Sequence, residues 1–181
     1  MTGLKLEIVQ EPPFFSVEEE ALLNLMRTAD SMHRAFHRGA REWGVTSTQY
    51  NVLRILRGAQ PHGLTCSAIG DRMITAEPDI TRLLSRLKTL KLIRQQRDRH
   101  DRRVVWTQIS EAGLKLLKEM DPIIQQLPID LLGHLSKPEL AELIRLLELA
   151  RTGAESLEHP KPQEPVTCDG TRCSVAEKQP A

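Results

Sequence analysis

The stretch that decides the fold is "RDRHDRR", residues 97–103. It holds four arginines, two aspartates and one histidine, and it separates two short β-like runs at 92–96 and 104–109. In the second run, Val105 and Ile109 fall on one side of an alternating pattern, which is typical of a strand. The sequence therefore predicts a β-hairpin whose loop is strongly basic.

Three helical segments precede this hairpin. Thr46 and Gln49 have the spacing of a capping box at the start of a short apolar helix that stops at Gly58. Thr65 is placed to cap a second short helix, and residues 76–90 form the third. This third helix is amphipathic, with an apolar side made of Ile80, Leu83, Leu84, Leu87 and Leu90. Three helices followed by a basic hairpin are the pattern of a winged helix-turn-helix.

The positive charge of the chain is concentrated in this region. Residues 77–103 contain nine basic and four acidic side chains, a net +5, whereas the whole chain of 181 residues carries only +1. Such a local excess favours a nucleic-acid backbone as the partner. We expect the third helix to enter the major groove and the loop to contact a neighbouring part of the duplex. The predicted DNA contacts are Pro78, Asp79, Thr81, Arg82, Arg86, Arg99, His100, Arg102 and Arg103.

The two aspartates of the loop indicate a supporting role. A carboxylate beside an arginine can hold the guanidinium in one orientation through charge-assisted hydrogen bonds. We therefore expect Asp98 and Asp101 to orient Arg99 and Arg102. Trp106 is expected to pack on the hairpin rather than to stack on bases.

Long helices flank the winged unit. Residues 18–43 carry apolar side chains at alternating spacings of four and three. Ser110 begins another long segment, which Pro122 and Pro128 should bend or interrupt, and "SKPE" at 136–139 begins a last helix. Because these apolar stripes exceed what the winged unit needs for its own core, we predict a homodimer.

The predicted fold class is mainly α with a small β-hairpin wing, a winged helix-turn-helix joined to a helical dimerisation region. The predicted segments are an extended N-terminal arm at 1–17, a dimerisation region at 18–45 and 111–153, a winged helix-turn-helix at 46–110 and a disordered, Pro-rich tail at 154–181. In the tail, Cys168 and Cys173 are interpreted as incidental rather than as a labile disulfide or a metal clip.

Residues 46–120 resemble the MarR family of bacterial transcriptional regulators. Five pieces match in order and spacing: "TSTQYNVLRIL", "LTCSAIGDRM", "DITRLLSRLKTLKLI", "DRHDRR" and "ISEAGLKLL". With the flanking helices, the resemblance covers residues 18–153. It implies a homodimer on a palindromic operator, usually a repressor that a small ligand releases. On the family pattern, Thr81 and Arg82 lie on the recognition helix and Arg102 lies in the wing.

The sequence departs from the family pattern at "AEPD", residues 76–79, and in its cysteine-bearing tail. The two acids at 77 and 79 either favour the helix dipole or accept a hydrogen bond from cytosine N4. The family's ligand pockets lie between the dimerisation helices and the winged unit. The corresponding residues here are His33, Phe36, His37 and Tyr50.

Two further patterns have competing interpretations. His33 and His37 have the spacing of a metal pair, but no third ligand is evident, so a polar spot between packed helices is favoured and no metal or cofactor is predicted. Cys66 begins a short helix, where a thiol can be reactive, but a small packed residue is the favoured interpretation.

Several function classes are not supported. There is no glycine-rich phosphate loop, no HExxH and no GxSxG, so no enzyme is predicted. Because neither a signal peptide nor a bilayer-length apolar run is evident, we expect a cytoplasmic protein and no membrane partner. The expected function is a sequence-specific regulator on double-stranded DNA. The alternative is a winged helix that contacts protein or RNA.

Overall fold

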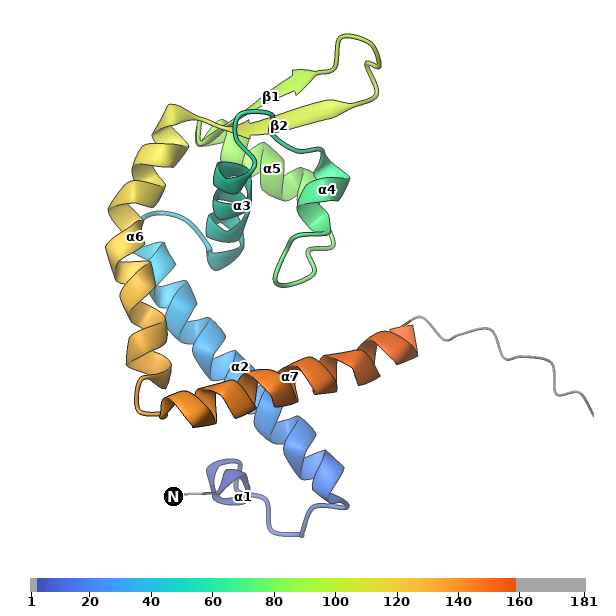
Figure 1. Ribbon diagram of the computed structural model, residues 1–181, viewed down its shortest axis with the longest axis vertical. Helices are drawn as coiled ribbons and strands as arrows, with labels where there is room; N and C mark the ends of the chain where they lie inside the picture. Colours follow the sequence, from blue (N-terminus) through green and yellow to red (C-terminus); the bar gives the residue numbers. More distant parts are fainter. Residues whose placement is uncertain (1–2, 159–181) are drawn as a thin grey trace, which may run out of the picture. The chain divides into compact units, whose positions relative to one another are not determined.

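The computed structural model describes residues 3–158 and divides into two compact units. The boundary between them in the sequence falls between His134 and Leu135. The first unit contains two strands and the helices up to residue 134, and the second contains the last helix. In chain order the elements are α1 (Leu4–Glu7), α2 (Val17–Arg41), α3 (Ser47–Gly58), α4 (Cys66–Gly70), α5 (Ile80–Thr89), β1 (Ile93–Arg97), β2 (Val105–Ile109), α6 (Glu111–Leu132) and α7 (Lys137–Glu158) (Figure 1). The predicted class, mainly α with a small β-hairpin wing, is confirmed.

The hairpin pairs β1 and β2 in antiparallel register, with Ile93 opposite Ile109 and Gln96 opposite Trp106. These strands lie within one residue of the predicted ones. Leu64, in the loop between α3 and α4, adds a short bridge to Thr107: its N–H donates to the Thr107 carbonyl (2.9 Å), and the Thr107 N–H donates back (2.8 Å). The base of the wing is therefore bonded on both sides of β2.

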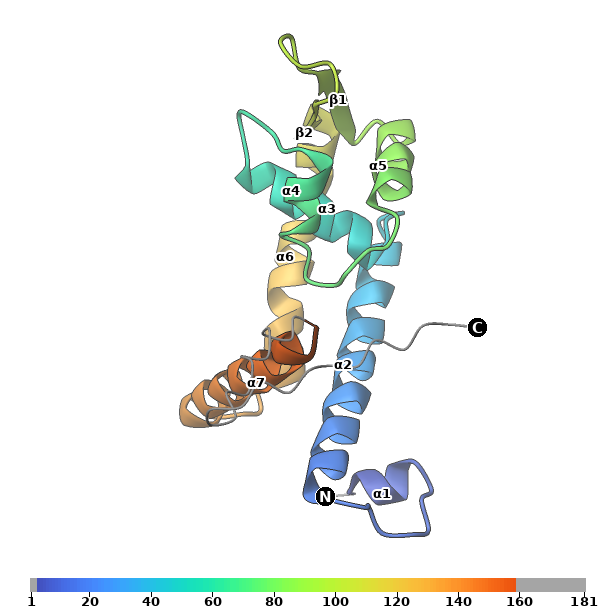
Figure 2. The same cartoon turned by 90° about the vertical axis from the view of Figure 1, so that its right-hand side faces the viewer.

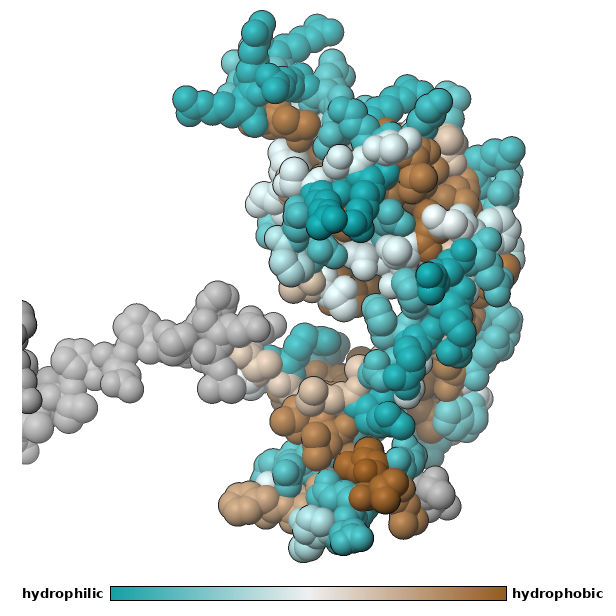
Figure 3. Space-filling model, turned by 180° about the vertical axis from the view of Figure 1, so that it is seen from behind, coloured by the Kyte–Doolittle hydropathy of each residue, from teal (hydrophilic) through white to brown (hydrophobic). Residues whose placement is uncertain are grey.

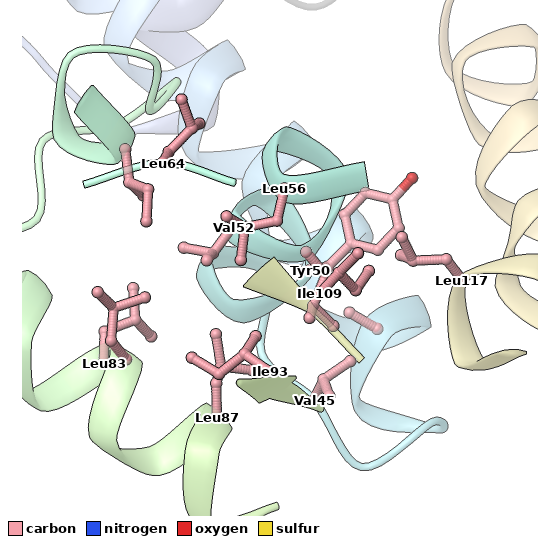
Figure 4. Packing of buried hydrophobic residues seen from close by; sticks show 14 of the residues in the cluster. Val45, Tyr50, Val52, Leu56, Leu64, Leu83, Leu87, Ile93, Ile109 and Leu117 are labelled. Carbon is pink, nitrogen blue, oxygen red and sulfur yellow. The ribbon is translucent and has the colours of Figure 1, made fainter. Parts of the chain in front are cut away.

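An aliphatic core holds the winged unit together. Its fully buried side chains include Val52, Leu53, Leu56, Ile69, Leu84, Leu87, Leu117 and Met120. In Figure 4, core side chains of α5 and the hairpin converge with those of α3. Each fully buried leucine or isoleucine contributes roughly 1.5–3 kcal/mol relative to an exposed one, so burial of these faces fixes where α5 and the hairpin sit.

Side-chain caps set the ends of the helices. The capping box at α3 is confirmed: Thr46 Oγ1 accepts from the Gln49 N–H (3.1 Å), and Gln49 Oε1 accepts from the Thr46 N–H (2.9 Å). Ser110 Oγ accepts from the Gly113 N–H and also donates to the carbonyl of Lys91 (2.7 Å). This second bond ties the start of α6 to the turn between α5 and β1. In that turn, Lys91 has a left-handed backbone with φ 60°.

Two sequence predictions about the flanking segments were wrong, and one was wrong in part. The arm at 1–17 is not wholly extended, because α1 forms within it and buries Leu4. Pro122 and Pro128 do not interrupt α6, which continues through both. Both prolines are exposed, so a carbonyl left without its N–H partner can bond to solvent. Helix α7 continues to Glu158, so 154–158 are not disordered.

The rest of the predicted tail, with Cys168 and Cys173, lies outside the described residues. Within residues 3–158, no helix is both long and apolar enough to cross a membrane.

Candidate nucleic-acid interface

Helix α5 begins later than its sequence pattern indicates. The predicted start at residue 76 was wrong, because Asp79 is the N-cap and the helix begins at Ile80. The carboxylate of Asp79 accepts from the backbone N–H of Arg82 (2.8 Å). Pro78 contributes to this boundary, because the residue before a proline is disfavoured in helical conformation. Asp79 therefore stabilises the start of the helix, as a carboxylate does at this end of the helix dipole.

The two faces of α5 differ sharply in burial. Leu83, Leu84 and Leu87 are buried in the core, and the opposite side is open to solvent. The exposed residues of the helix are Thr81, Arg82, Ser85, Arg86, Lys88 and Thr89. Three cations and three hydroxyl groups thus belong to the exposed side of a short helix. Figure 2 shows this helix, α5, at one edge of the winged unit. This composition suits contact with base edges and phosphates.

The wing tip is built around Asp98. One of its carboxylate oxygens accepts from the backbone N–H groups of His100 (2.8 Å) and Asp101 (3.0 Å). The other accepts from the indole Nε1–H of Trp106 (3.0 Å). The Asp101 carboxylate in turn accepts from the backbone N–H of Arg103 (2.9 Å). The loop therefore has an internal hydrogen-bonded scaffold.

This scaffold corrects the prediction that Asp98 and Asp101 orient the guanidinium groups of Arg99 and Arg102. In the described part of the chain, neither carboxylate pairs with either guanidinium, because both already accept from backbone N–H groups. The hydrogen bond from the Asp101 backbone is the largest cause that lowers the pKa of the Asp98 carboxyl, followed by those from Trp106 and His100.

The cations of the tip point to solvent. Arg97, Arg99, His100, Arg102 and Arg103 are all exposed, and the tip forms a hydrophilic projection (Figure 3). None of these four arginines has an acidic partner among the residues described. The guanidinium groups are therefore free to meet phosphate oxygens.

Trp106 is a residue whose role sequence reasoning missed. It was expected to pack on the hairpin, and its hydrogen bond to Asp98 was not predicted. It lies outside the buried core and keeps 36% of its surface exposed. With His62, Gln96 and Arg97 it lines a polar hollow on the outer side of the hairpin. A sequence signal did exist, because a tryptophan at a strand position facing away from the core needs a partner for its N–H.

Known proteins are similar to this chain over the segment that contains α5 and the wing. The sequence model of the MarR family matches residues 43–104. A crystal structure of a MarR transcription factor from Planctomyces limnophilus is 42% identical, covers 76% of this chain and 99% of that one, and superposes with a TM-score of 0.59. The chain belongs to the MarR family.

Two further MarR-family comparisons extend this result. The regulator MhqR of Bacillus subtilis (strain 168) is 32% identical over 95 residues, 51% of this chain and 60% of that protein, so the match spans less than two thirds of MhqR. BpsR of Bordetella bronchiseptica, whose DNA binding is regulated by 6-hydroxynicotinic acid, is 25% identical, with a TM-score of 0.66 over 78% of this chain and 98% of that one. The chain is a MarR-family transcriptional regulator.

The residues predicted for a ligand pocket of this MarR-family chain form two neighbouring pairs. The rings of Phe36 and Tyr50 lie 5.5 Å apart and tilted, and those of His33 and His37 stack at 6.2 Å. Tyr50 is buried in the core, and this burial raises the pKa of its hydroxyl. Nδ1 of His37 is buried without a hydrogen-bond partner. Within residues 3–158, no three His, Cys, Asp or Glu side chains gather to hold a metal ion.

Cys66 is the first residue of α4 in the MarR-family winged unit. It is partly buried, and its Sγ is 4.0 Å from Oγ1 of Thr81 on α5. This contact joins the first turn of α4 to the exposed face of α5. It agrees with the favoured interpretation of Cys66 as a packed residue.

Proposed function

We propose that this chain is a sequence-specific repressor that binds a palindromic operator in double-stranded DNA as a homodimer and is released by a small ligand. The observation that carries the proposal is the exposed basic surface formed by α5 and the wing. Residues 77–103 hold a net +5, and the wing arginines have no acidic partner within the described chain. Relatives named as transcriptional regulators support it.

The two parts of this surface have different tasks in the proposal. Helix α5 enters the major groove, where Thr81 and Arg82 reach base edges and Arg86 lies beside them. Pro78 and Asp79 lie at the edge of this contact. Because the Asp79 carboxylate already accepts from the backbone N–H of Arg82, we assign Asp79 to capping α5 rather than to a hydrogen bond from cytosine N4. The wing residues Arg99, His100, Arg102 and Arg103 contact phosphates or the adjacent minor groove.

The homodimer is proposed from exposed apolar side chains. In α2, Leu22, Leu25 and Met26 are 57%, 40% and 59% exposed. In α7, taken by itself, Ile144, Leu146 and Leu149 are between 48% and 57% exposed. Large apolar side chains left exposed in such numbers favour an interface with a partner. We propose a second copy as the partner, with 18–45 and 111–153 forming the dimerisation region and 46–110 the DNA-binding domain.

Release by a ligand is proposed from the surroundings of His37. A buried ring nitrogen without a partner costs free energy unless a polar group reaches it. The ring of His33 stacks on that of His37, and the adjacent Phe36 packs against Tyr50. A small molecule with a planar ring and a hydrogen-bond donor would satisfy Nδ1 of His37. We propose that the regulator acts in the cytoplasm, where operator DNA is found.

The test is selection of bound sequences from a pool of random duplex DNA by the full chain. We expect an enriched palindrome whose half-site centres lie about one helical turn, roughly 34–36 Å, apart. A preference for single-stranded RNA, or no enrichment of any duplex, would favour the alternative of a protein- or RNA-contacting winged helix. An enriched site without two-fold symmetry would contradict the homodimer.

A further inference from the structure

We propose that Trp106 and Asp98 are a positioning pair that fixes the shape of the wing tip, so that Arg99 and Arg102 are presented to the duplex in one arrangement. Neither residue is proposed to touch DNA. The inference rests on the proposed DNA binding, and it assigns to two residues outside the predicted interface a role in its affinity.

The geometry gives each oxygen of the Asp98 carboxylate a separate partner. Oδ1 accepts from the loop backbone at His100 and Asp101, and Oδ2 accepts from the indole of Trp106. The backbone N–H of Asp98 also donates to the carbonyl of Val104 (2.9 Å), which closes the loop. Because both oxygens are held from different directions, the carboxylate has one preferred orientation. The loop backbone is thereby connected to β2 through a side chain.

Trp106 is suited to this task and to no other that the structure shows. It lies on the outer face of β2, opposite Gln96, and contributes nothing to the buried core. Its Nε1–H spans eight residues of sequence to reach Asp98. Phenylalanine keeps part of the aromatic surface of tryptophan but has no N–H donor. Trp106→Phe therefore removes the hydrogen bond to Asp98 and keeps an aromatic ring at this position.

A wing tip that is already ordered loses less conformational entropy when it binds the duplex. A flexible loop must lose conformational freedom when its arginines meet phosphates, and this loss weakens binding. Since the carboxylates bond to the backbone, the scaffold orders the loop without occupying the guanidinium groups. Removal of the indole N–H should make the backbone of the wing tip more mobile. It should leave the number of cations, and thus of phosphate contacts, unchanged.

The first measurement uses the free full chain. Backbone amide ¹⁵N relaxation should show His100, Asp101 and Arg103 ordered in the wild type and more mobile in Trp106→Phe and in Asp98→Asn. Gln96→Ala is the matched control, because Gln96 shares the outer face of the hairpin and its side chain makes no hydrogen bond among the described residues. Unchanged order of the tip in Trp106→Phe would overturn the proposal, whatever the chain binds.

The second measurement is duplex affinity across a range of salt concentrations. Trp106→Phe should bind roughly three- to tenfold more weakly at every salt concentration, with an unchanged salt slope, because only the ordering cost has risen. In the Asp98→Asn background, one of the two acceptor oxygens is replaced by an NH2 group, so the loop backbone and the indole N–H can no longer each have an oxygen of their own. There the same substitution should change affinity by less than about twofold. Gln96→Ala should bind as the wild type does.

The outcomes separate this inference from the proposed function. If the wild type binds no duplex, the proposed function fails, and the relaxation data still decide whether the pair orders the tip. If the wild type binds and Trp106→Phe binds equally well, the positioning role is wrong. If Trp106→Phe loses affinity equally in both backgrounds, Trp106 acts by direct stacking or through the fold as a whole, and the pair is again excluded.

Discussion

At the scale of single residues, the candidate interface depends on how α5 presents Arg82. The backbone N–H of Arg82 is bonded to the Asp79 cap, whereas its side chain is exposed beside Thr81. An arginine in this place can bridge O6 and N7 of guanine or clamp a phosphate next to the groove. The two roles differ in what they do to sequence preference, and this difference makes them separable.

The variant Arg82→Ala tests whether Arg82 recognises a base. We expect a loss of about 1–3 kcal/mol on the selected operator and a flattened preference at one position in each half-site. Binding titrations on the operator and on a random duplex measure both effects. An equal loss on the two duplexes would mean that Arg82 only positions the helix, and specificity would then come from Thr81 or from DNA shape.

Asp98 makes a prediction about pH. The pKa of its carboxyl is lowered from the usual 3.8, first by the bond from the Asp101 backbone and then by those from Trp106 and His100. A depressed pKa in the folded state means that this group stabilises the fold above pH 3.8 and loses that contribution as the pH falls through the folded value.

Acid titration of the wing should therefore differ between variants. The indole N–H resonance of Trp106 should shift as Asp98 is protonated below pH 3.8, and that shift should be missing in Asp98→Asn. Proton NMR of both proteins measures it. An indole resonance that shifts identically in the two proteins would show that another group titrates.

The wing also shows how far sequence reasoning reaches at this scale. It predicted the exposed and buried faces of α5 and the basic tip, because periodicity and charge are local properties. It assigned the loop carboxylates to the wrong partners, because backbone N–H groups carry no sequence signal and compete effectively for a carboxylate once the loop is closed. The hydrogen bond from Trp106 to Asp98 was not predicted either, because its two side chains are eight residues apart in the sequence.

At the scale of elements, an ion pair adds to the core packing between α3 and α6. Nη1 of Arg57 on α3 donates to both carboxylate oxygens of Asp121 (3.0 and 2.8 Å), and both side chains are about one-third exposed. Sequence separates the two residues by 64 positions, so neither pattern nor propensity could predict the pair. Helix starts were predicted well where caps are local, as at Thr46, and poorly at 76–79, where the proline and the Asp79 cap shorten α5.

The variant Asp121→Asn should destabilise the chain by about 1–2 kcal/mol, because a part-buried charge-assisted contact is lost and Arg57 keeps its desolvation cost. Urea unfolding measures the change. Glu119→Gln is the matched control on the same helix: its pair with Lys115 is 4.0 Å long and largely exposed, so the expected effect is within about 0.5 kcal/mol. Equal effects of the two variants would contradict a structural role for the Arg57–Asp121 pair.

At the scale of the whole molecule, the exposed apolar side chains of α2 support the proposed homodimer. Sequence reasoning found this stripe because heptad spacing is visible without a structure. It predicted neither α1 nor the extension of α7 to Glu158.

Sedimentation at micromolar concentration should show twice the chain mass of 20.5 kDa. The double variant Leu22→Glu and Met26→Glu should sediment as a monomer and lose most operator affinity, because a single winged unit contacts one half-site only. Thr28→Glu, an exposed polar position on the same helix, is the control and should remain dimeric. A well-folded wild-type monomer would contradict the proposed homodimer.

In the turn between α5 and β1, backbone energy and positive charge favour different residues at position 91. Glycine adopts a left-handed backbone more readily than other residues do, yet this position holds Lys91, whose ammonium group adds to the basic surface. Directed evolution for thermostability alone would therefore favour Lys91→Gly, a gain of up to about 1 kcal/mol in backbone energy. The same variant would leave the joint between helix and wing with one cation fewer. A heat-selected library of this regulator should thus drift toward proteins that survive longer and hold nucleic acid less firmly.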